Sequence, residues 1–243
     1  MDEALTEDTL LGGRVRLAQP RHGFRAAVDP VLLAAFVPAR PGDAVLELGC
    51  GSGAAFLCLA ARVPGVTVTA LERDASLAEL ATRNASANGV AATVLTGDLR
   101  EARLPEVAHG FANPPFWPGG TPSPNSTRRQ ASHEQALLVD WVTALGKAVR
   151  TRGTASLVLP ASRFAEASSL LRSAGFGAVS LCPLWPRVGV AAKRVLLRAV
   201  KGGRGPDAVL PGLVLHAGTS WSATADAVLR EGAALPVNPP DAR

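Results

Sequence analysis

Cysteine is scarce in this chain of 243 residues, and the three that occur, Cys50, Cys58 and Cys182, are scattered along it. An odd number of cysteines without CxxC spacing supports neither a disulfide framework nor a zinc site. The four histidines show no metal-ligand spacing either, and no GxSxG nucleophile motif is present. The sequence therefore predicts no metal and favours a reducing cytoplasm as the location of the protein.

Long apolar runs are missing as well, since no segment offers 18 consecutive apolar residues, and the N-terminus is acidic. Neither a transmembrane span nor a secretory signal is expected from such a sequence. A hydrophobic content of 47% with 19% charged residues predicts a folded domain with a buried core. The net charge of +5 is concentrated in clusters, which suit a polyanion such as RNA but also fit an ordinary basic surface.

The middle of the chain alternates between short apolar strands and amphipathic helices. Strands are expected at residues 44–48, 66–71, 92–96, 107–112 and 154–159, and helices at 54–62, 74–88, 134–150 and 162–174. Two more strands, 178–182 and 194–200, have no helical pattern between them and should pair antiparallel. This order predicts an α/β fold with a mostly parallel sheet and helices on both faces.

The two ends differ from this core. Residues 1–8 are polar and acidic and are expected to be loose, whereas the alternating residues 14–18 and the turn-rich residues 19–23 predict an opening hairpin. Asp29 with Pro30 is expected to cap a helix that continues to residue 37. The expected organisation is an N-terminal hairpin and helix extension over residues 1–40, a core over 41–200, and a tail over 201–243 that packs on the core and holds a helix at 223–231.

A glycine-rich loop follows the first strand of the core, where Gly49, Gly51 and Gly53 alternate before a helix. Glycine is needed where the backbone turns sharply or where a ligand presses on it, and open α/β sheets bind ligands beyond the carboxyl ends of their strands. Glu72 ends the next strand, where a carboxylate can hold two ribose hydroxyls. Asp98 ends the third, where it can accept a hydrogen bond from an adenine amino group. Together these residues predict a nucleoside pocket.

The residues Asn113-Pro114-Pro115-Phe116 follow the fourth strand. An amino group on a nucleobase is a poor nucleophile, because its lone pair is delocalised into the ring. The Asn113 side-chain oxygen and the Pro114 carbonyl can each accept a hydrogen bond from such a group, and two prolines stiffen the direction of that carbonyl. Phe116 offers a flat face on which a base can stack, a contact worth roughly 1–3 kcal/mol. The motif predicts chemistry on a planar amino nitrogen.

Residues 46–53, Glu72, Asp98 and residues 113–116 resemble the motif series of class I S-adenosylmethionine methyltransferases that act on amino groups. The resemblance implies a Rossmann-like sheet of seven strands with helices on both faces and an antiparallel last strand. It implies S-adenosylmethionine as cofactor, S-adenosylhomocysteine as product, and residues 113–116 as the catalytic motif. The cofactor contacts that it implies are Phe24, Asp29, Glu47, Gly49, Cys50, Gly51, Gly53, Glu72, Asp98, Leu99 and Asn113, although Asp29 fits a helix cap equally well.

Residues 11–17, 29–34 and 193–203 are similar to the bacterial valine-tRNA adenine-N6 methyltransferases, which modify the purine 3′ of the anticodon. This likeness implies methyl transfer to N6 of an adenine in tRNA. Phe116 stands where many members have tyrosine, and phenylalanine also occurs there in guanine-N2 methyltransferases of ribosomal RNA, which leaves that activity as the nearest alternative. Glutamine-N5 methylation of a protein, or RNA binding without turnover, are more distant ones. The expected RNA contacts are Trp117, Arg128, Arg129, Lys193 and Arg194.

Overall fold

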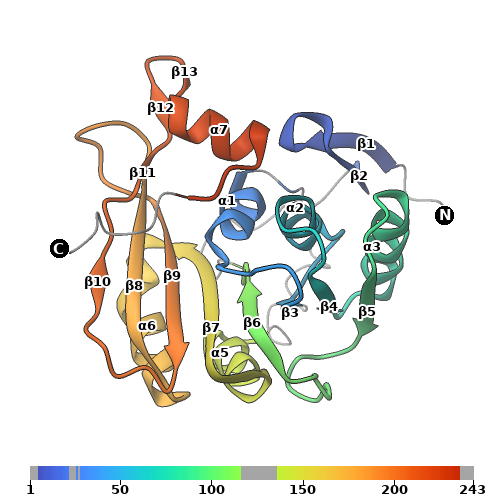
Figure 1. Ribbon diagram of the computed structural model, residues 1–243, viewed down its shortest axis with the longest axis horizontal. Coiled ribbons are helices and arrows are strands. Elements are labelled where there is room, and N and C mark those ends of the chain that lie inside the picture. Colours follow the sequence, from blue (N-terminus) through green and yellow to red (C-terminus); the bar gives the residue numbers. More distant parts are fainter. Residues whose placement is uncertain (1–4, 22–25, 27, 116–135, 236–243) are drawn as a thin grey trace, which may run out of the picture.

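The centre of the protein is a nine-stranded sheet with the strand order β10-β8-β9-β7-β6-β3-β4-β5, in which β11 also pairs with β8 (Figure 1). The computed structural model describes residues 5–21, 26, 28–115 and 136–235. The seven longer strands are β3 (Ala44–Leu48), β4 (Thr67–Glu72), β5 (Ala92–Thr96), β6 (Val107–Ala112), β7 (Val149–Pro160), β8 (Phe176–Trp185) and β9 (Arg194–Lys201). Strand β9 is antiparallel to both β7 and β8, and the other pairs are parallel. The predicted fold class is confirmed. The two-residue strands β10 (Ala208–Val209) and β11 (Leu213–Val214) extend the sheet beyond β8.

Helices cover both faces of the sheet (Figure 1). One face carries α1 (Val28–Phe36), α2 (Ala54–Arg62) and α3 (Ala75–Ala87), and the other carries α5 (Leu138–Ala148) and α6 (Phe164–Ser173). Because successive strand residues point to opposite faces, Val45 and Phe111 join the first core while their neighbours Leu46 and Ala112 join the second. None of the helices in the described part of the chain is long and apolar enough to cross a membrane.

The N-terminal hairpin is built differently from the sequence prediction. Strand β1 (Leu5–Leu10) pairs antiparallel with β2 (Val15–Pro20) through a short 3-10 turn at Leu11–Gly13, so the hairpin turn precedes residues 14–18 instead of following them. Gly12 and Gly13 have φ angles of 62° and 93°, a region that favours glycine and allows this turn. The acidic residues 5–8, predicted to be loose, therefore belong to a strand.

Two asparagines of α3 attach this hairpin to the core. Asn84 accepts a hydrogen bond from the backbone N–H of Ala18 at 3.0 Å and donates to its carbonyl at 2.9 Å, and Asn88 does the same for Arg16. These amides replace the missing neighbouring strand of β2, whose backbone groups would otherwise lack partners. Asn84 also donates to the carbonyl of Ser52, in the glycine-rich loop, at 2.9 Å.

Several predicted boundaries are corrected by the tertiary pairing. Helix α1 already includes Val28, so Asp29 lies in its first turn and is not the N-cap. Arg150, predicted at the end of a helix, belongs to β7, because Val149 pairs with Val107 of β6. Strand β8 is longer than the predicted residues 178–182, since it pairs with β9 along most of its length. Helix α6 starts at Phe164, after a 3-10 turn.

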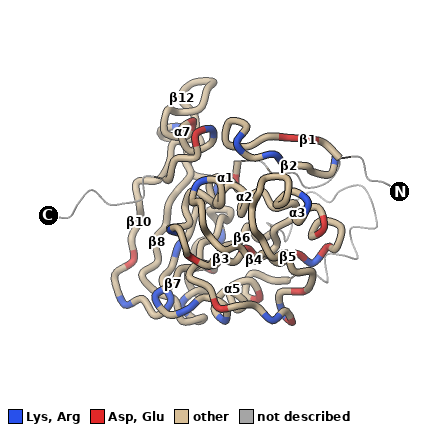
Figure 2. Tube along the Cα trace, turned by 45° about the vertical axis from the view of Figure 1, so that its right-hand side comes forward, with Lys and Arg blue, Asp and Glu red and all other residues tan. Residues whose placement is uncertain are grey.

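The C-terminal part of the chain packs against α1 and the turn of the N-terminal hairpin. After the hairpin of β12 (His216–Ala217) and β13 (Ser220–Trp221), helix α7 (Ala223–Glu231) contacts α1 and the turn at Leu11–Gly13. Arg14 joins the two ends of the chain by donating to the carbonyls of Glu231 and Ala61, both at 2.7 Å. Figure 2 shows that charged residues are distributed around the outside of the molecule, whereas the β12–β13 hairpin carries none.

Candidate active site

The carboxyl ends of four parallel strands meet at one edge of the sheet. Leu48 of β3 pairs with Leu71 of β4 and with Ala112 of β6, and Glu72 pairs with Thr96 of β5. The segments that follow these strands therefore lie side by side. They bring together most of the residues that the sequence predicted to be functional and that the structure describes: Glu47, Gly49, Cys50, Gly51, Gly53, Glu72, Asp98, Leu99, Asn113, Pro114 and Pro115.

The three glycines of the loop after β3 all have positive φ angles, of 63° at Gly49, 54° at Gly51 and 96° at Gly53. A Cβ atom on Gly49 would lie 2.4 Å from the Trp141 ring, and one on Gly53 would lie 2.7 Å from Phe56, so both positions are packed. A Cβ on Gly51 would meet no atom of the described residues within 4 Å. The Gly51 side of the loop is thus open, as a loop that receives a ligand requires.

Glu72 connects this loop to the following turn. One of its carboxylate oxygens accepts from the backbone N–H of Gly51 at 2.9 Å, and the other accepts from that of Asp74 at 3.0 Å. An ionised carboxylate offers about four acceptor positions, so two remain available on this partly exposed side chain. Glu72 can therefore hold the glycine-rich loop and still accept hydrogen bonds from a pair of hydroxyl groups.

Glu47 is a buried carboxyl group directly beneath the loop, with 3% of its surface exposed. Its carboxylate accepts from the backbone N–H of Phe56 at 2.8 Å, in the first turn of α2, where such donors have no partner within the helix. Burial, together with repulsion from Glu72, raises the pKa of Glu47 to about 8, although the Phe56 hydrogen bond opposes the shift. Cys50 in the same loop is buried, and burial raises the pKa of its thiol, so it serves as a small packing residue.

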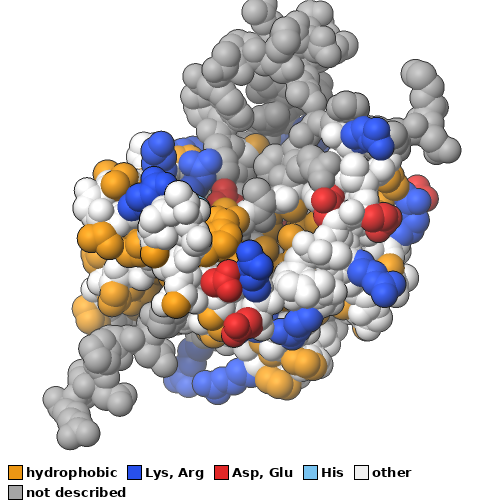
Figure 3. Space-filling view, turned by 90° about the horizontal axis from the view of Figure 1, so that it is seen from above, with side chains coloured by type: hydrophobic (Ala, Val, Ile, Leu, Met, Phe, Trp, Pro, Cys, Tyr) orange, Lys and Arg blue, Asp and Glu red, His pale blue; other side chains and the backbone are white. Residues whose placement is uncertain are grey.

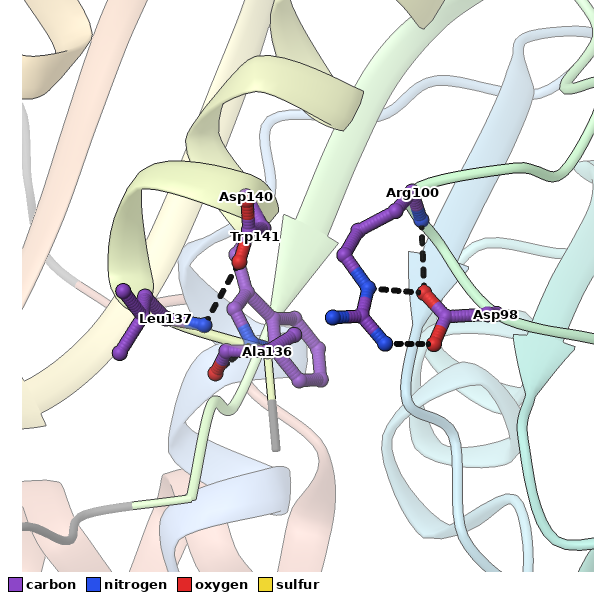
Figure 4. Close-up of polar contacts among 6 residues, drawn as sticks. All are labelled: Asp98, Arg100, Ala136, Leu137, Asp140 and Trp141. Atoms are coloured by element: carbon purple, nitrogen blue, oxygen red, sulfur yellow. Dashed lines mark hydrogen bonds and ion pairs between the residues drawn. The ribbon is translucent and has the colours of Figure 1, made fainter. Parts of the chain in front are cut away.

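Asp98 is held by a residue that the sequence analysis did not single out. The guanidinium of Arg100 donates to both Asp98 oxygens, at 2.9 and 2.5 Å, and the Arg100 backbone N–H donates to one of them at 2.9 Å (Figure 4). These contacts hold the pKa of Asp98 at about 2, so that it is an ionised acceptor at neutral pH. Because both residues are partly exposed, the pair adds little to stability. Its effect is to orient the carboxylate.

Trp141 of α5 forms the wall opposite Asp98 and Arg100 (Figure 4). Its buried ring covers Gly49, and its indole N–H points to the Ala136 carbonyl at 3.4 Å. The start of α5 is fixed by Asp140, which accepts from the Leu137 backbone N–H at 2.8 Å. Trp141 could not be assigned to the site from the sequence, because no local pattern indicates contact with a loop so far away in the chain.

Asn113 lies immediately after β6, at the same edge. Its side-chain oxygen is buried, and within the part of the chain that the structure describes it has no hydrogen-bond partner. A buried acceptor left unpaired costs about 1–3 kcal/mol, and such groups are uncommon in folded proteins. The next residue, Pro114, is buried, and Pro115 is exposed. The arrangement leaves one amide oxygen available for an incoming donor.

Known methyltransferases resemble this chain in sequence and in fold. The family model of the methyltransferase small domain matches residues 27–140. A protein from Actinobacillus succinogenes named tRNA1(Val) (adenine(37)-N6)-methyltransferase is 29% identical over 195 residues, which cover 77% of this chain and 81% of the relative. One of the same name from Shewanella sediminis is 29% identical over 154 residues, 59% of this chain and 63% of that protein. A crystal structure of a predicted O-methyltransferase from Agrobacterium tumefaciens, 26% identical, covers 85% of this chain and 97% of its own with a TM-score of 0.72.

The chain is a class I S-adenosylmethionine-dependent methyltransferase. This confirms the enzyme class and the cofactor predicted from the sequence. The open side at Gly51, the free acceptor positions of Glu72 and the oriented Asp98 carboxylate fit a nucleoside group at this edge. The bound cofactor supplies a methyl group on a positively charged sulfur.

Some predicted site residues of the methyltransferase are placed elsewhere or are not described. Asp29 and Arg194, predicted to contact the cofactor and RNA respectively, form an ion pair with each other at 3.3 Å. Lys193 is exposed next to them. Phe24, Phe116, Trp117, Arg128 and Arg129 lie outside the described residues. Within residues 5–21, 26, 28–115 and 136–235, no group of three or more His, Cys, Asp or Glu side chains could hold a metal ion.

The raised pKa of Glu47 predicts a pH-dependent stability of the methyltransferase. The folded protein holds this proton more tightly than the unfolded chain, so the contribution is complete below about pH 4.5 and is lost as the pH rises to about 8. The free energy of unfolding should fall by on the order of 5 kcal/mol over this interval. In Glu47→Gln, which keeps an acceptor for the Phe56 N–H, the free energy of unfolding should fall less over this interval. Urea unfolding at several pH values tests this, and parallel curves for the two proteins would contradict it.

Asp98→Asn should weaken the binding of S-adenosylmethionine about 10- to 100-fold, the range for a lost hydrogen bond to a charged group. The amide offers one acceptor oxygen instead of two and does not hold Arg100 as a charged partner. Calorimetric titration measures the effect. Glu101→Gln is the matched control, because it removes an exposed carboxylate three residues further along the chain. Equal affinities for the two variants would show that Asp98 does not contact the cofactor.

Proposed function

We propose that the enzyme transfers a methyl group from S-adenosylmethionine to N6 of an adenine in RNA, and that the RNA is a tRNA. The observation that carries the proposal is the buried side-chain oxygen of Asn113, which has no hydrogen-bond partner among the described residues and lies at the same sheet edge as the glycine-rich loop. The relatives named tRNA1(Val) (adenine(37)-N6)-methyltransferase support the choice of adenine and of tRNA. The net charge of +5 fits a polyanionic substrate.

The proposed role of each site residue follows from its hydrogen-bonding capacity. The open face at Gly51 lets the cofactor approach the backbone, Glu72 accepts from its ribose hydroxyls, and Asp98 accepts from its adenine amino group. Glu47 supports the loop indirectly, because its carboxyl group accepts a hydrogen bond from Phe56 in the first turn of α2. Leu99 is partly buried next to Asp98, and the buried Cys50 packs beneath the glycine-rich loop.

The substrate amino group approaches from the Asn113 side. Asn113 Oδ1 and the Pro114 carbonyl each accept a hydrogen bond from one of its two N–H groups. These two hydrogen bonds draw the nitrogen lone pair out of conjugation with the ring. Bound S-adenosylmethionine would give up its methyl group to this nitrogen and leave as the neutral thioether, and the two oxygens would stabilise the positive charge on the nitrogen. Asparagine cannot take up the extra proton, which passes to solvent after the transfer. Holding the reactants in line contributes about 7–11 kcal/mol.

Mass spectrometry of nucleosides tests this assignment. The enzyme is incubated with isotopically labelled S-adenosylmethionine and, separately, with bulk tRNA, ribosomal RNA and a release factor. We expect labelled N6-methyladenosine from tRNA. Labelled N2-methylguanosine from ribosomal RNA, or methylated glutamine in the protein, would replace the proposal with the corresponding activity. Incorporation into none of them, with intact cofactor and RNA binding, would identify a binding protein without turnover.

A further inference from the structure

We infer that two C-terminal segments, residues 186–194 and 215–222, form a second RNA-binding surface that holds nucleotides next to the one that is methylated. This surface is called the C-terminal ledge below. The inference rests on the proposed function, since it takes the substrate to be RNA. It concerns residues that neither the cofactor pocket nor the Asn-Pro-Pro motif uses.

The first segment of the ledge, residues 186–194 between β8 and β9, is basic and exposed. It contains three cations, Arg187, Lys193 and Arg194, and no acidic residue. Among the described residues neither Arg187 nor Lys193 forms an ion pair, whereas Arg194 pairs with Asp29. Val188 is 84% exposed. A loop that displays cations without carboxylate partners attracts an anion such as phosphate.

The second segment carries a stacked aromatic pair. His216 of β12 and Trp221 of β13 face each other across the hairpin, with ring centroids 4.4 Å apart and an interplanar angle of 19°. Both side chains are partly exposed. The hairpin carries no formally charged residue, so aromatic and polar groups dominate its surface. A fixed, flat pair of rings is a suitable platform on which an unpaired base can stack.

Hydrogen bonds join the two segments into one surface. The backbone N–H of His216 donates to the Pro186 carbonyl at 3.1 Å, and that of Leu215 donates to the Trp185 carbonyl at 2.7 Å. Arg187 Nε donates to the Gly218 carbonyl, at the tip of the hairpin, at 3.4 Å. Arg187 and the aromatic pair are therefore held close to each other, as a surface that binds both a phosphate and a base must hold them.

The ledge lies at the same edge of the sheet as the active site. Strand β8 runs parallel to β7 and β6, because all three are related through the antiparallel β9 or by direct parallel pairing. The carboxyl end of β8 at Trp185 therefore points to the same side as that of β6, where Asn113 lies. Figure 1 shows the loop and hairpin beyond the upper ends of β8 and β9, and Figure 3, seen from above, shows basic side chains gathered at the upper left of this edge.

A single-stranded RNA segment fits this chemistry better than a protein partner. Cations beside an aromatic platform are the combination by which proteins bind unpaired nucleotides without opening a duplex. We therefore assign Arg187 and Lys193 to phosphates and the His216–Trp221 pair to a base flanking the target. Neither set contacts the reacting atoms, so both should affect RNA affinity and leave the chemical step unchanged.

The test compares RNA affinity and steady-state kinetics of wild type, Arg187→Ala/Lys193→Ala and His216→Ala, with tRNA as substrate. The double variant should raise KM for tRNA about tenfold. It should also reduce the slope of the logarithm of the binding constant against the logarithm of the salt concentration by about 1.4, the contribution of two phosphates of a single strand. His216→Ala should raise KM about fivefold without changing that slope. For both variants we expect an unchanged kcat and an unchanged Kd for S-adenosylmethionine.

Lys147→Ala/Arg150→Ala is the matched control, because it removes two exposed cations at the end of α5 and the start of β7, on the opposite edge of the sheet. If it changes KM and the salt slope as much as the ledge variant, the effect is one of net charge and the ledge assignment is wrong. A ledge variant that changes the oligomeric state and not KM would identify a protein interface instead. Absence of RNA methylation by wild type would contradict the proposed function itself.

Discussion

Asn113→Ala should lower kcat for methyl transfer about 100- to 1000-fold, the effect of removing one preorganised group that stabilises transition-state charge. In the wild type this oxygen is already buried and has no partner within the described part of the chain, so it needs no reorganisation when the substrate amino group arrives. The alanine variant removes the acceptor and also the cost of leaving it unpaired in the folded protein. It should therefore fold at least as stably as wild type and bind S-adenosylmethionine with an affinity within about tenfold, while the chemical step is lost.

Single-turnover kinetics with saturating cofactor and RNA measure this effect directly. Asn113→Asp is the useful companion variant, since it keeps an acceptor oxygen at the same position and should retain more activity than alanine. Thermal unfolding and cofactor titration show that each variant is folded and loaded. A kcat for Asn113→Ala within threefold of wild type would show that Asn113 does not stabilise the transition state.

Gly51→Ala should abolish or strongly weaken cofactor binding, by more than tenfold, with little damage to the fold. An alanine at a φ of 54° costs about 1–2 kcal/mol, and its Cβ would meet none of the atoms that the structure describes within 4 Å. It would instead occupy the open side of the loop, where the backbone must approach the cofactor. Binding is measured by calorimetric titration with S-adenosylhomocysteine, and stability by urea unfolding.

Two other glycines provide matched controls for this prediction. Gly89, at the end of α3, has a φ of 66° and equally open surroundings, so Gly89→Ala should lose the same stability and keep full cofactor affinity. Gly49→Ala should instead destabilise the fold by about 2–5 kcal/mol, because its Cβ would lie 2.4 Å from the Trp141 ring. If Gly51→Ala and Gly89→Ala bind the cofactor equally well, the open face of the loop is not its binding surface.

Elements whose limits are set by their own residues could be predicted from the sequence. Helix α2 and strand β6 begin and end where the apolar pattern indicated, and Asp74 caps α3 as expected, accepting from two backbone N–H groups of its first turn. The glycine-rich loop was predictable for the same reason. Its three residues with positive φ are a local requirement that glycine meets most easily.

Features that depend on residues distant in the chain were not predictable. The contact of Trp141 with Gly49 follows from the packing of α5 on the sheet, and the ion pair of Asp29 with Arg194 joins residues 165 positions apart. The turn of the hairpin was predicted after residues 14–18, but it precedes them. The true turn at Leu11–Gly13 is short and glycine-rich, as many ordinary loops are, so the sequence does not distinguish it from a loop. Arg100 is only two residues from Asp98, but no sequence rule says that its side chain turns back to that carboxylate.

The central claim is that the cofactor and the substrate amino group meet at the carboxyl edge of β3 to β6, with Asn113 as the acceptor. A crystal structure of the enzyme with S-adenosylhomocysteine tests it most directly. We predict the adenine next to Asp98, the ribose on Glu72, and room for one nitrogen about 3 Å both from Asn113 Oδ1 and from the site of the transferred methyl carbon. The product bound at another edge, or an Asn113 oxygen that points away from its sulfur, would contradict the claim.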